Sequence, residues 1–328
     1  MKVLVTGATG MLGRSTARAL QARGDDVTVL QRRPSGLPCG EALADIADIA
    51  AVRRAAAGQD AVVHLAAKVD VVGPWHEYAH ANIDGTRAVV AACRSGGVAR
   101  LVHVSSPSVA HAGQPLVGVG AERADPTRAR GHYARSKAVA EQEALAADSS
   151  ALAVLCIRPH LVWGPGDRQL VARIVARSRA GRLPVVGSGA ALVDTTYVDN
   201  AVDALIAAVD ADPSVRGEAL VVSNGEPRTV VEILRRLCAA ASVPAPRGWV
   251  PRSLARMAGS AFDSYWALRG RRGAPPLTRF LVEQLTIAHW FDQRRTQEVL
   301  SWTPRISIDQ GFARLADWFA EQHPGRGA

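Results

Sequence analysis

The chain has 328 residues, 48% of them hydrophobic and 21% charged, which is enough apolar material for one enlarged core or two cores. This composition excludes a disordered chain and a short disulfide scaffold. The net charge of +9 does not predict a nucleic-acid-binding protein, because the basic residues are scattered and aromatic residues make up only 5% of the chain.

The sequence also bears on location and on metal binding. No apolar run approaches the roughly 20 residues of a membrane-spanning helix, and a strand-like run starts at Val3, which leaves no room for a signal peptide. We therefore expect a cytoplasmic protein. The cysteines are far apart and predict buried, reduced thiols with no metal site. They are Cys39, Cys93, Cys156 and Cys238.

Runs typical of buried strands alternate with alanine-rich stretches of helical length through the first half of the chain. This alternation predicts βαβ units and a doubly wound parallel sheet of the Rossmann kind, covered by helices on both faces. The expected strands are Val3–Thr6, Val27–Leu30, Ala61–Leu65, Leu101–Val104 and Ala153–Ile157.

Glycine and proline become more frequent after Pro159, and we expect a smaller C-terminal substrate domain to begin near Gly166. A later strand, Ala219–Ser223, follows a helix expected over Asp199–Val209 and is predicted to rejoin the main sheet. We therefore predict a dinucleotide-binding domain over residues 1–165, rejoined by 195–223. Residues 166–194 and 224–328 would form the substrate-binding region.

A glycine-rich turn separates the first strand from an apolar helix expected over Met11–Leu20. Glycines at such a turn let the backbone approach a pyrophosphate, which then lies at the helix N-terminus where free N–H groups favour negative charge. The sequence of the turn is Thr6-Gly7-Ala8-Thr9-Gly10-Met11-Leu12-Gly13. We predict cofactor contacts from Gly7, Thr9, Gly10, Met11, Leu12 and Gly13.

The end of the second strand bears on which dinucleotide is bound. An acidic residue there would accept hydrogen bonds from a free ribose 2′-hydroxyl, but this strand ends in Gln31-Arg32-Arg33 and supplies no carboxylate. Two guanidinium groups suit a 2′-phosphate, and Arg14 could reach the same group. We therefore predict that Arg32 and Arg33 favour NADP(H), with NAD(H) as the alternative.

A second motif, Tyr133-x-x-x-Lys137, opens a helix expected to continue through Glu143. Residues four apart share a helix face, and a nearby ammonium group lowers the pKa of a phenol from its usual value of about 10. Tyr133 would then be a usable acid or base. The fourth strand ends in Ser105-Ser106, and we choose Ser106, with Ser105 as the alternative, to polarise the reacting oxygen.

With these motifs the chain resembles an extended short-chain dehydrogenase/reductase of the 3β-hydroxysteroid dehydrogenase type. It resembles in particular the bacterial 2-alkyl-3-oxoalkanoate reductases of olefin biosynthesis. The resemblance spans nearly the whole chain. Besides the turn, Ser105-Ser106 and Tyr133-x-x-x-Lys137, it is carried by His64-Leu65-Ala66-Ala67-Lys68, Asn82 before Gly85-Thr86, Ser106-Pro107-Ser108-Val109, Arg158-Pro159, Gly164-Pro165-Gly166-Asp167, Tyr197-Val198-Asp199-Asn200, Asn224-Gly225-Glu226-Pro227 and Pro276-Leu277-Thr278-Arg279-Phe280.

The resemblance implies roles for individual residues. Ser106 would be the catalytic hydroxyl, Tyr133 the acid or base, and Lys137 a partner of Tyr133 that also holds the nicotinamide ribose. The remaining cofactor contacts implied are Asp45 and Ile46 at the adenine, Ala66, Ala67 and Lys68 along the dinucleotide, and Pro159 and His160 beside the nicotinamide. Two positions depart from the family: Gln31 replaces the acid of NAD-preferring members, and the olefin-pathway reductases often have threonine at Ser106.

The leading interpretation is an NADP(H)-dependent oxidoreductase that interconverts a ketone and a secondary alcohol on a lipid-like small molecule, of the β-keto acid or 3β-hydroxysteroid type. One alternative is a sugar-nucleotide epimerase or dehydratase with tightly bound NAD, because that class uses the same fold and triad. The other is a dinucleotide-sensing protein without activity, although such proteins commonly lack the tyrosine and lysine. We also expect a homodimer.

Several other residues attract attention without predicting chemistry. His64, His103 and His111 are interpreted as packed or exposed side chains and Asp199 as a helix N-cap. Four aromatic residues either wall an apolar pocket or belong to a core: Trp75, Trp163, Tyr265 and Trp266.

Residues 254–272 combine apolar and aromatic residues at roughly helical spacing with a basic end at Arg269, Arg271 and Arg272. They are interpreted either as a cap on the second core or as a lid or interfacial helix with peripheral membrane contact.

Overall fold

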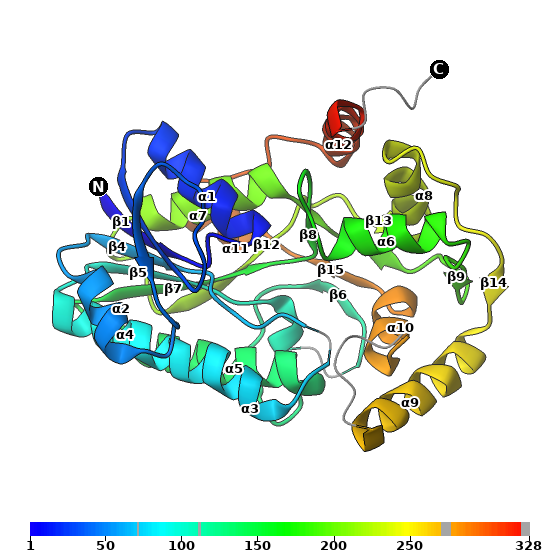
Figure 1. The fold of residues 1–328 in the computed structure, drawn as a ribbon, viewed down its shortest axis with the longest axis horizontal. Coiled ribbons are helices and arrows are strands. Elements are labelled where there is room, and N and C mark those ends of the chain that lie inside the picture. The colour runs from blue at the N-terminus through cyan, green and yellow to red at the C-terminus, as the bar shows by residue number, and fades with distance from the viewer. Residues whose placement is uncertain (71, 111–112, 270–276, 323–328) are drawn as a thin grey trace.

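The computed structural model describes residues 1–70, 72–110, 113–269 and 277–322. A parallel sheet of seven strands lies between two layers of helices in one half of the molecule (Figure 1). The strand order is β12-β7-β5-β4-β1-β2-β3, and every neighbouring pair is parallel. The bounds are β1 (Lys2–Thr6), β2 (Asp26–Gln31), β3 (Gly40–Leu43), β4 (Ala61–His64), β5 (Arg100–Val104), β7 (Ala153–Pro159) and β12 (Glu218–Val222). The predicted doubly wound parallel sheet is confirmed.

Both faces of the sheet are buried, which explains the continuous apolar runs of its strands. In β1, Val3 and Val5 pack on the face covered by α1 (Met11–Ala22) and α7 (Val198–Asp210), whereas Leu4 packs on the opposite face. The opposite face is covered by α2 (Ile49–Ala56), α4 (Gly85–Gly96) and α5 (Gly131–Leu145). Between β4 and α4 the chain forms α3 (Trp75–Tyr78) and a π-helical stretch, Ala79–Asp84.

The strand order reverses between β1 and β4, because the chain builds outward from β1 to β3 and then returns to build outward from β4 to β12. The carboxyl ends of parallel strands at such a reversal form the crevice in which open α/β sheets bind ligands. The glycine turn follows β1, and Ser105 and Ser106 follow β5, so the fold brings the predicted motifs to one edge of the sheet.

The second region is built on a mixed sheet with the order β13-β10-β15-β6. Its strands are β6 (Leu116–Val119), β10 (Leu192–Val193), β13 (Arg228–Thr229) and β15 (His289–Phe291); two further short pairs are β8 (Val162–Trp163) with β11 (Thr196–Tyr197) and β9 (Val185–Val186) with β14 (Trp249–Val250). Its helices are α6 (Leu170–Arg179), α8 (Val230–Ala240), α9 (Arg252–Arg269), α10 (Arg279–Thr286) and α12 (Ile308–Gln322). Helix α11 (Arg294–Leu300) packs instead on β12 and α7 of the main sheet, and a 3-10 turn, Pro107–Ala110, follows β5.

Most of the segment 254–272 lies on α9, and its interpretation as a cap on the second core or as an interfacial helix stays a prediction. Arg271, Arg272 and the side chain of Arg269 lie outside the described residues. No helix in the described residues has the length and apolar character to cross a bilayer.

Between these elements the chain returns to the main sheet, since β12 pairs in parallel with β7. The division into a cofactor-binding domain and a substrate-binding region stays a prediction.

Two asparagines, Asn200 on α7 and Asn224 after β12, tie the C-terminal segment to the rest of the fold. The side-chain oxygen of Asn200 accepts hydrogen bonds from the backbone N–H groups of Arg305 and Ile306, both at 3.0 Å. The Asn200 amide donates to Asn224 Oδ1 at 3.0 Å and to the Ile306 carbonyl at 2.7 Å, and Asn224 Nδ2 donates to the same carbonyl. We call Asn200 and Asn224 the asparagine pair.

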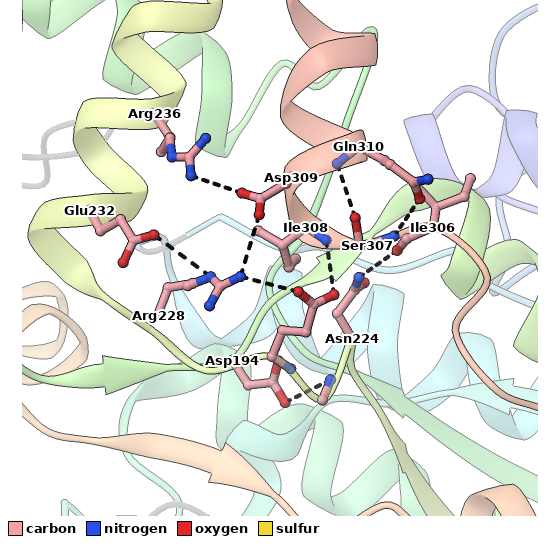
Figure 2. Close-up of polar contacts among 12 residues, drawn as sticks. Asp194, Asn224, Arg228, Glu232, Arg236, Ile306, Ser307, Ile308, Asp309 and Gln310 are labelled. Carbon is pink, nitrogen blue, oxygen red and sulfur yellow. Dashed lines mark hydrogen bonds and ion pairs between the residues drawn. The ribbon is translucent and has the colours of Figure 1, made fainter.

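Ion pairs at the surface also stabilise the position of the C-terminal segment (Figure 2). Arg228 lies between Glu232 and Asp309, at 3.7 Å from each, and Arg236 pairs with Asp309 at 2.9 Å. The side chain of Glu226 accepts a hydrogen bond from the Ile308 N–H at the start of α12. Helix α12 is therefore fixed to α8 and to the turn after β12.

Two smaller expectations need revision. Asp199 is the second residue of α7 and pairs with Arg314 at 3.0 Å, so the prediction that it is the N-cap was wrong; Tyr197 occupies that position. The four cysteines are free thiols, of which Cys39 is half-buried and the other three are buried.

Candidate active site

The glycine turn is packed so closely on neighbouring backbone that two of its glycines have no room for a side chain. Gly7 has a φ of +80°, and a Cβ there would lie 2.8 Å from the backbone nitrogen of Ala66; a Cβ at Gly13 would overlap the Gly7 carbonyl. Helix α1 begins at Met11, with no side-chain cap and no acidic residue in its first turn. Because the first N–H groups of the helix face no competing anion from their own turn, the arrangement fits a dinucleotide phosphate.

The end of β2, where the sequence predicts the adenosine ribose to bind, lies beside a carboxylate that the sequence analysis missed. Oε1 of Glu41, on β3, accepts hydrogen bonds from the side chain of Gln31 at 2.8 Å and from the N–H of Ser35 at 2.7 Å. The end of β2 itself supplies no carboxylate, as expected, but β3 pairs with β2 and brings Glu41 beside it. These hydrogen bonds lower the pKa of Glu41.

The predicted phosphate-binding arginines lie on the loop after β2. Arg32 and Arg33 are both exposed. Arg14 donates to the carbonyl of Ser35 in the same loop. The loop is thus held at Ser35 from two sides, by Glu41 and by Arg14, while its two arginines face outward.

The next predicted contacts lie between β3 and α2. Ile46 is buried and packs so closely on Gly85 that a Cβ at Gly85 would lie 2.7 Å from its Cγ2. Oδ1 of Asp45 accepts a hydrogen bond from the N–H of Ala47 and lies 3.1 Å from Nε2 of His80. Glycine at position 85 therefore lets the Asp45-Ile46 turn sit against α4.

The segment after β4 is held by a buried hydrogen-bond chain. Thr86 donates to the Asn82 carbonyl at 2.7 Å, so its oxygen accepts from Nε2 of His64 at 3.1 Å. Nδ1 of His64 then accepts from Thr6 at 2.8 Å, and the Thr6 oxygen accepts from the N–H groups of Leu65 and Ala66. Every link is consistent with one neutral tautomer of His64, protonated on Nε2.

Burial, with a smaller effect from Lys137, lowers the pKa of His64 to about 3. His103 is also fully buried, and its pKa is lowered for the same reason. Both histidines are packed, as expected; His111 lies outside the described residues.

Lys68, a predicted cofactor contact, has its ammonium group already engaged. Its Nζ pairs with Asp70 at 2.8 Å and with Glu77 at 2.9 Å. Asn82 fixes its backbone by accepting from the Lys68 N–H at 2.7 Å and donating to its carbonyl at 3.1 Å. The backbone of residues 66–68 is therefore better placed to contact a cofactor than the Lys68 side chain is.

The structure brings Ser106 and Tyr133 together. The hydroxyl of Ser106 lies close enough to the Tyr133 phenol to lower its pKa, and it lies 3.0 Å from Oγ of Ser108. Ser105, the alternative, is buried, and its hydroxyl has no hydrogen-bond partner in the described part of the chain. The geometry favours Ser106 as the partner of the tyrosine.

Lys137 lies on α5, one helical turn after Tyr133. Its Nζ donates to the Val104 carbonyl at 2.6 Å and lies 3.4 Å from Nε2 of His103. Burial lowers the pKa of Lys137 to about 8, opposed by Cys156 and Glu141.

The expected lowering of the Tyr133 pKa by Lys137 is not observed. Burial raises the pKa of Tyr133, and the hydrogen bond from Ser106 opposes that rise. The physical reason is that the ammonium group is turned to a backbone carbonyl at the end of β5.

Pro159 and His160 end β7 on the side facing the second region. Nδ1 of His160 donates to the Asp194 carbonyl at 2.6 Å, and its ring packs edge-on against His289 and Phe291 of β15 at 4.8 and 4.9 Å. Burial raises the pKa of Asp194 to about 6. The carboxylate of Asp194 nevertheless accepts hydrogen bonds from the Ser223 hydroxyl and from the N–H groups of Gly225 and Glu226. His160 therefore lies at the junction of the two sheets.

The aromatic residues divide into different environments. Trp163 is fully buried and stacks on Phe312 with ring centres 4.6 Å apart, so it belongs to the second core. Trp75 lies under the guanidinium group of Arg135, at 4.8 Å. Tyr265 and Trp266 contact each other on α9.

Comparison with known proteins shows which family the chain belongs to. The model of the NAD dependent epimerase/dehydratase family matches residues 3–223. The chain is 41% identical over 324 residues to a 2-alkyl-3-oxoalkanoate reductase of Stenotrophomonas maltophilia (strain K279a), covering 96% of this chain and 98% of that protein. It is 35% identical to a 2-alkyl-3-oxoalkanoate reductase of Shewanella oneidensis, covering 95% and 84%.

Among solved structures, MoeE5 in complex with UDP-glucose and NAD is 27% identical, with a TM-score of 0.74, and covers 98% of this chain and 99% of that one. The family match covers more than half of the chain and includes the glycine turn, Ser106, Tyr133 and Lys137. The chain belongs to the NAD dependent epimerase/dehydratase family, the extended short-chain dehydrogenases/reductases.

Proposed function

We propose that this protein, an NAD(P)-dependent oxidoreductase, reduces the ketone of a lipid-like substrate to a secondary alcohol and prefers NADP(H). The observation that carries the substrate class is the 41% identity, over nearly the full length of both chains, to a 2-alkyl-3-oxoalkanoate reductase. A β-keto acid with an alkyl branch is therefore the first substrate to test, and a 3β-hydroxysteroid is the second. Cytoplasmic location and a homodimer stay predictions from the sequence.

The proposed chemistry assigns one task to each polar group. A bound nicotinamide dinucleotide supplies the hydride for the carbonyl carbon. Ser106 donates a hydrogen bond to the carbonyl oxygen, and Tyr133, the proposed catalytic acid, gives that oxygen its proton. Lys137 holds the nicotinamide ribose. Asn82 supports Tyr133 indirectly, because its amide donates to Ser136 at 2.8 Å and Ser136 donates to the Tyr133 carbonyl at 2.8 Å.

The proposed preference for NADP(H) rests on the loop after β2. Arg32 and Arg33 can meet a 2′-phosphate with charge-assisted hydrogen bonds, which a 2′-hydroxyl cannot accept with equal strength. Glu41 supports the loop that carries them, since its Oε1 is already engaged by Gln31 and Ser35. Replacing both arginines with alanine should weaken NADPH about tenfold or more and leave NADH nearly unchanged.

The test combines a substrate screen with matched serine variants. Purified protein is mixed with NADPH or NADH and with 2-alkyl-3-oxoalkanoates, hydroxysteroids or UDP-sugars, and oxidation or reduction of the nicotinamide is followed by absorbance. Ser106→Ala should abolish most of the turnover. Ser105→Ala removes the same hydroxyl group from the neighbouring residue and should retain the turnover. Equal losses in the two variants would contradict the assignment of Ser106.

A sugar-nucleotide epimerase or dehydratase is the second candidate, favoured by the likeness to MoeE5 bound to UDP-glucose and NAD. The two candidates differ in cofactor behaviour. An epimerase would convert a UDP-sugar without net change in nicotinamide absorbance and would retain its NAD through gel filtration, whereas the proposed reductase consumes NADPH stoichiometrically. Dinucleotide binding without turnover of any of these compounds would instead indicate a sensor.

A further inference from the structure

A row of three buried polar side chains crosses the face of the main sheet that α4 and α5 cover. The row consists of His64 on β4, His103 on β5 and Cys156 on β7, which are paired in register on neighbouring strands. Side chains alternate along a strand, and each of the three follows a core residue of this face by two positions, so all three lie on the same face. The two imidazole rings are 5.3 Å apart. The carboxyl ends of three neighbouring strands therefore carry polar groups inside an apolar core.

Lys137 of α5 reaches this row, so three basic side chains are buried together. Its Nζ lies 3.4 Å from Nε2 of His103 and donates to the Val104 carbonyl at 2.6 Å. His64, His103 and Lys137 are 1%, 0% and 3% exposed. A buried ammonium group needs hydrogen-bond acceptors, and the row lies where they could come from.

The other ionisable groups around Lys137 are neutral or already paired. Glu141, one turn further along α5, acts on the charge of Lys137 but is bound by Arg158 of β7. Burial raises the pKa of the Cys156 thiol well above its usual value and also raises the pKa of the Tyr133 phenol. The ammonium group therefore has no negative charge beside it that is not shared with an arginine, within the described part of the chain.

The tautomer of His103 explains why a histidine is buried here. An ammonium group only donates, so Nε2 of His103 accepts from it. Burial, with smaller effects from Lys137 and His64, lowers the pKa of His103 well below its usual value, so the ring is neutral and its one proton is on Nδ1. Nδ1 is buried without a hydrogen-bond partner in the described part of the chain. Because a buried donor without an acceptor destabilises a fold, leucine would be the better core residue unless the acceptor nitrogen is needed.

We propose that His103 is a positioning residue for Lys137. Its neutral imidazole accepts a hydrogen bond from the ammonium group, which holds Nζ at the end of β5 and stabilises the buried charge. With the Val104 carbonyl, this engages two of the three N–H bonds of the ammonium group and leaves the third for the nicotinamide ribose. The ribose contact rests on the proposed function, whereas the hydrogen bond between His103 and Lys137 exists without it.

Urea unfolding from pH 7 to about pH 10.5, without cofactor, tests the hydrogen bond. The folded pKa of Lys137 lies below the unfolded one, so the free energy of unfolding begins to rise with pH near the folded value, about 8 in the wild type. A hydrogen bond to a charged group shifts a pKa by about one unit. His103→Leu removes the acceptor and lowers the pKa of Lys137, so in this variant the rise should begin about one pH unit lower.

Two further variants separate this hydrogen bond from packing. His103→Gln keeps an acceptor near the position of Nε2, so its stability should depend on pH nearly as in the wild type. In Lys137→Met, where the ammonium group is absent, adding His103→Leu should not shift the pH dependence. A single cooperative unfolding transition shows that each variant is folded.

The reductase assay gives an independent pH profile. Because the proposed ribose contact needs a charged lysine, turnover should fall as the pH rises through the pKa of Lys137. His103→Leu should bring this fall about one pH unit lower, with NADPH and the ketone both saturating, and His103→Gln should restore it.

The same pH dependence of stability in His103→Leu and the wild type would overturn the role of His103. An equal shift in the Lys137→Met background would overturn it too, because the shift would then come from another group. Absence of ketone turnover in the wild type, with the shift in stability present, would contradict the proposed function and leave the contact between His103 and Lys137 supported.

Discussion

Replacing Lys137 with methionine should change how the stability of the protein depends on pH. Burial lowers the pKa of Lys137 to about 8 from its ordinary value of 10.5. One pKa unit corresponds to about 1.4 kcal/mol, so below pH 8 the buried ammonium group destabilises the folded state by about 3 kcal/mol. Methionine has a similar length and carries no charge.

The sign of the effect follows from proton binding. The folded pKa lies below the unfolded one, so between about pH 8 and pH 10.5 the unfolded chain binds more protons, and the free energy of unfolding rises with pH. From about pH 7 to pH 9.5 the wild type should therefore gain about 2 kcal/mol that Lys137→Met does not gain. Urea unfolding at several pH values, without cofactor, measures the free energy of unfolding of the wild type and of Lys137→Met.

The control for this prediction is Lys2→Met, which removes an exposed lysine. The difference in slope should appear in Lys137→Met and be absent from Lys2→Met. Parallel stability curves for the wild type and Lys137→Met would refute the reasoning, because they would mean that Lys137 keeps the same proton affinity in the folded and unfolded chains.

Three further predictions concern the site and the fold. Tyr133→Phe should lower turnover by about 10² or more with little change in NADPH affinity, since it removes a positioned acid; near-normal turnover would contradict the role of the phenol. Glu41→Ala should weaken NADPH several-fold more than NADH in a fluorescence titration, while Glu41→Gln, which keeps an acceptor for Gln31 and Ser35, should be milder; an equal effect on both dinucleotides would show that Glu41 does not act through the loop. Asn200→Ala leaves two backbone N–H groups without their acceptor and should reduce the free energy of unfolding by about 3 kcal/mol in urea; an unchanged midpoint would contradict the importance of the asparagine pair.

The main sheet could be predicted from the sequence because each of its central strands is a local apolar run. The glycine turn and the Tyr133–Lys137 spacing are local for the same reason, since the strand, turn or helix that carries each motif also sets its geometry. These signals were sufficient to place the candidate site at one edge of the sheet.

What the sequence did not predict depends on contacts between distant parts of the chain. Glu41 lies on β3, a short strand with partly exposed residues, and reaches Gln31 only because β3 pairs with β2. The direction of the Tyr133 pKa shift depends on where Nζ of Lys137 points, and spacing along a helix does not determine that. The strands of the second sheet have two to four residues each, too few for a periodic pattern.

The asparagine pair also affects how the protein ages chemically. Asn224 precedes Gly225, a pair that deamidates readily in flexible chains, because the unhindered glycine nitrogen attacks the asparagine side chain. Here the Gly225 nitrogen donates to Asp194 at 3.2 Å, and the Asn224 side chain is held by Asn200, Tyr197 and Ile306. Since neither reacting group can turn toward the other without breaking these hydrogen bonds, the folded protein should keep Asn224 intact during long storage, while the unfolded chain should lose it.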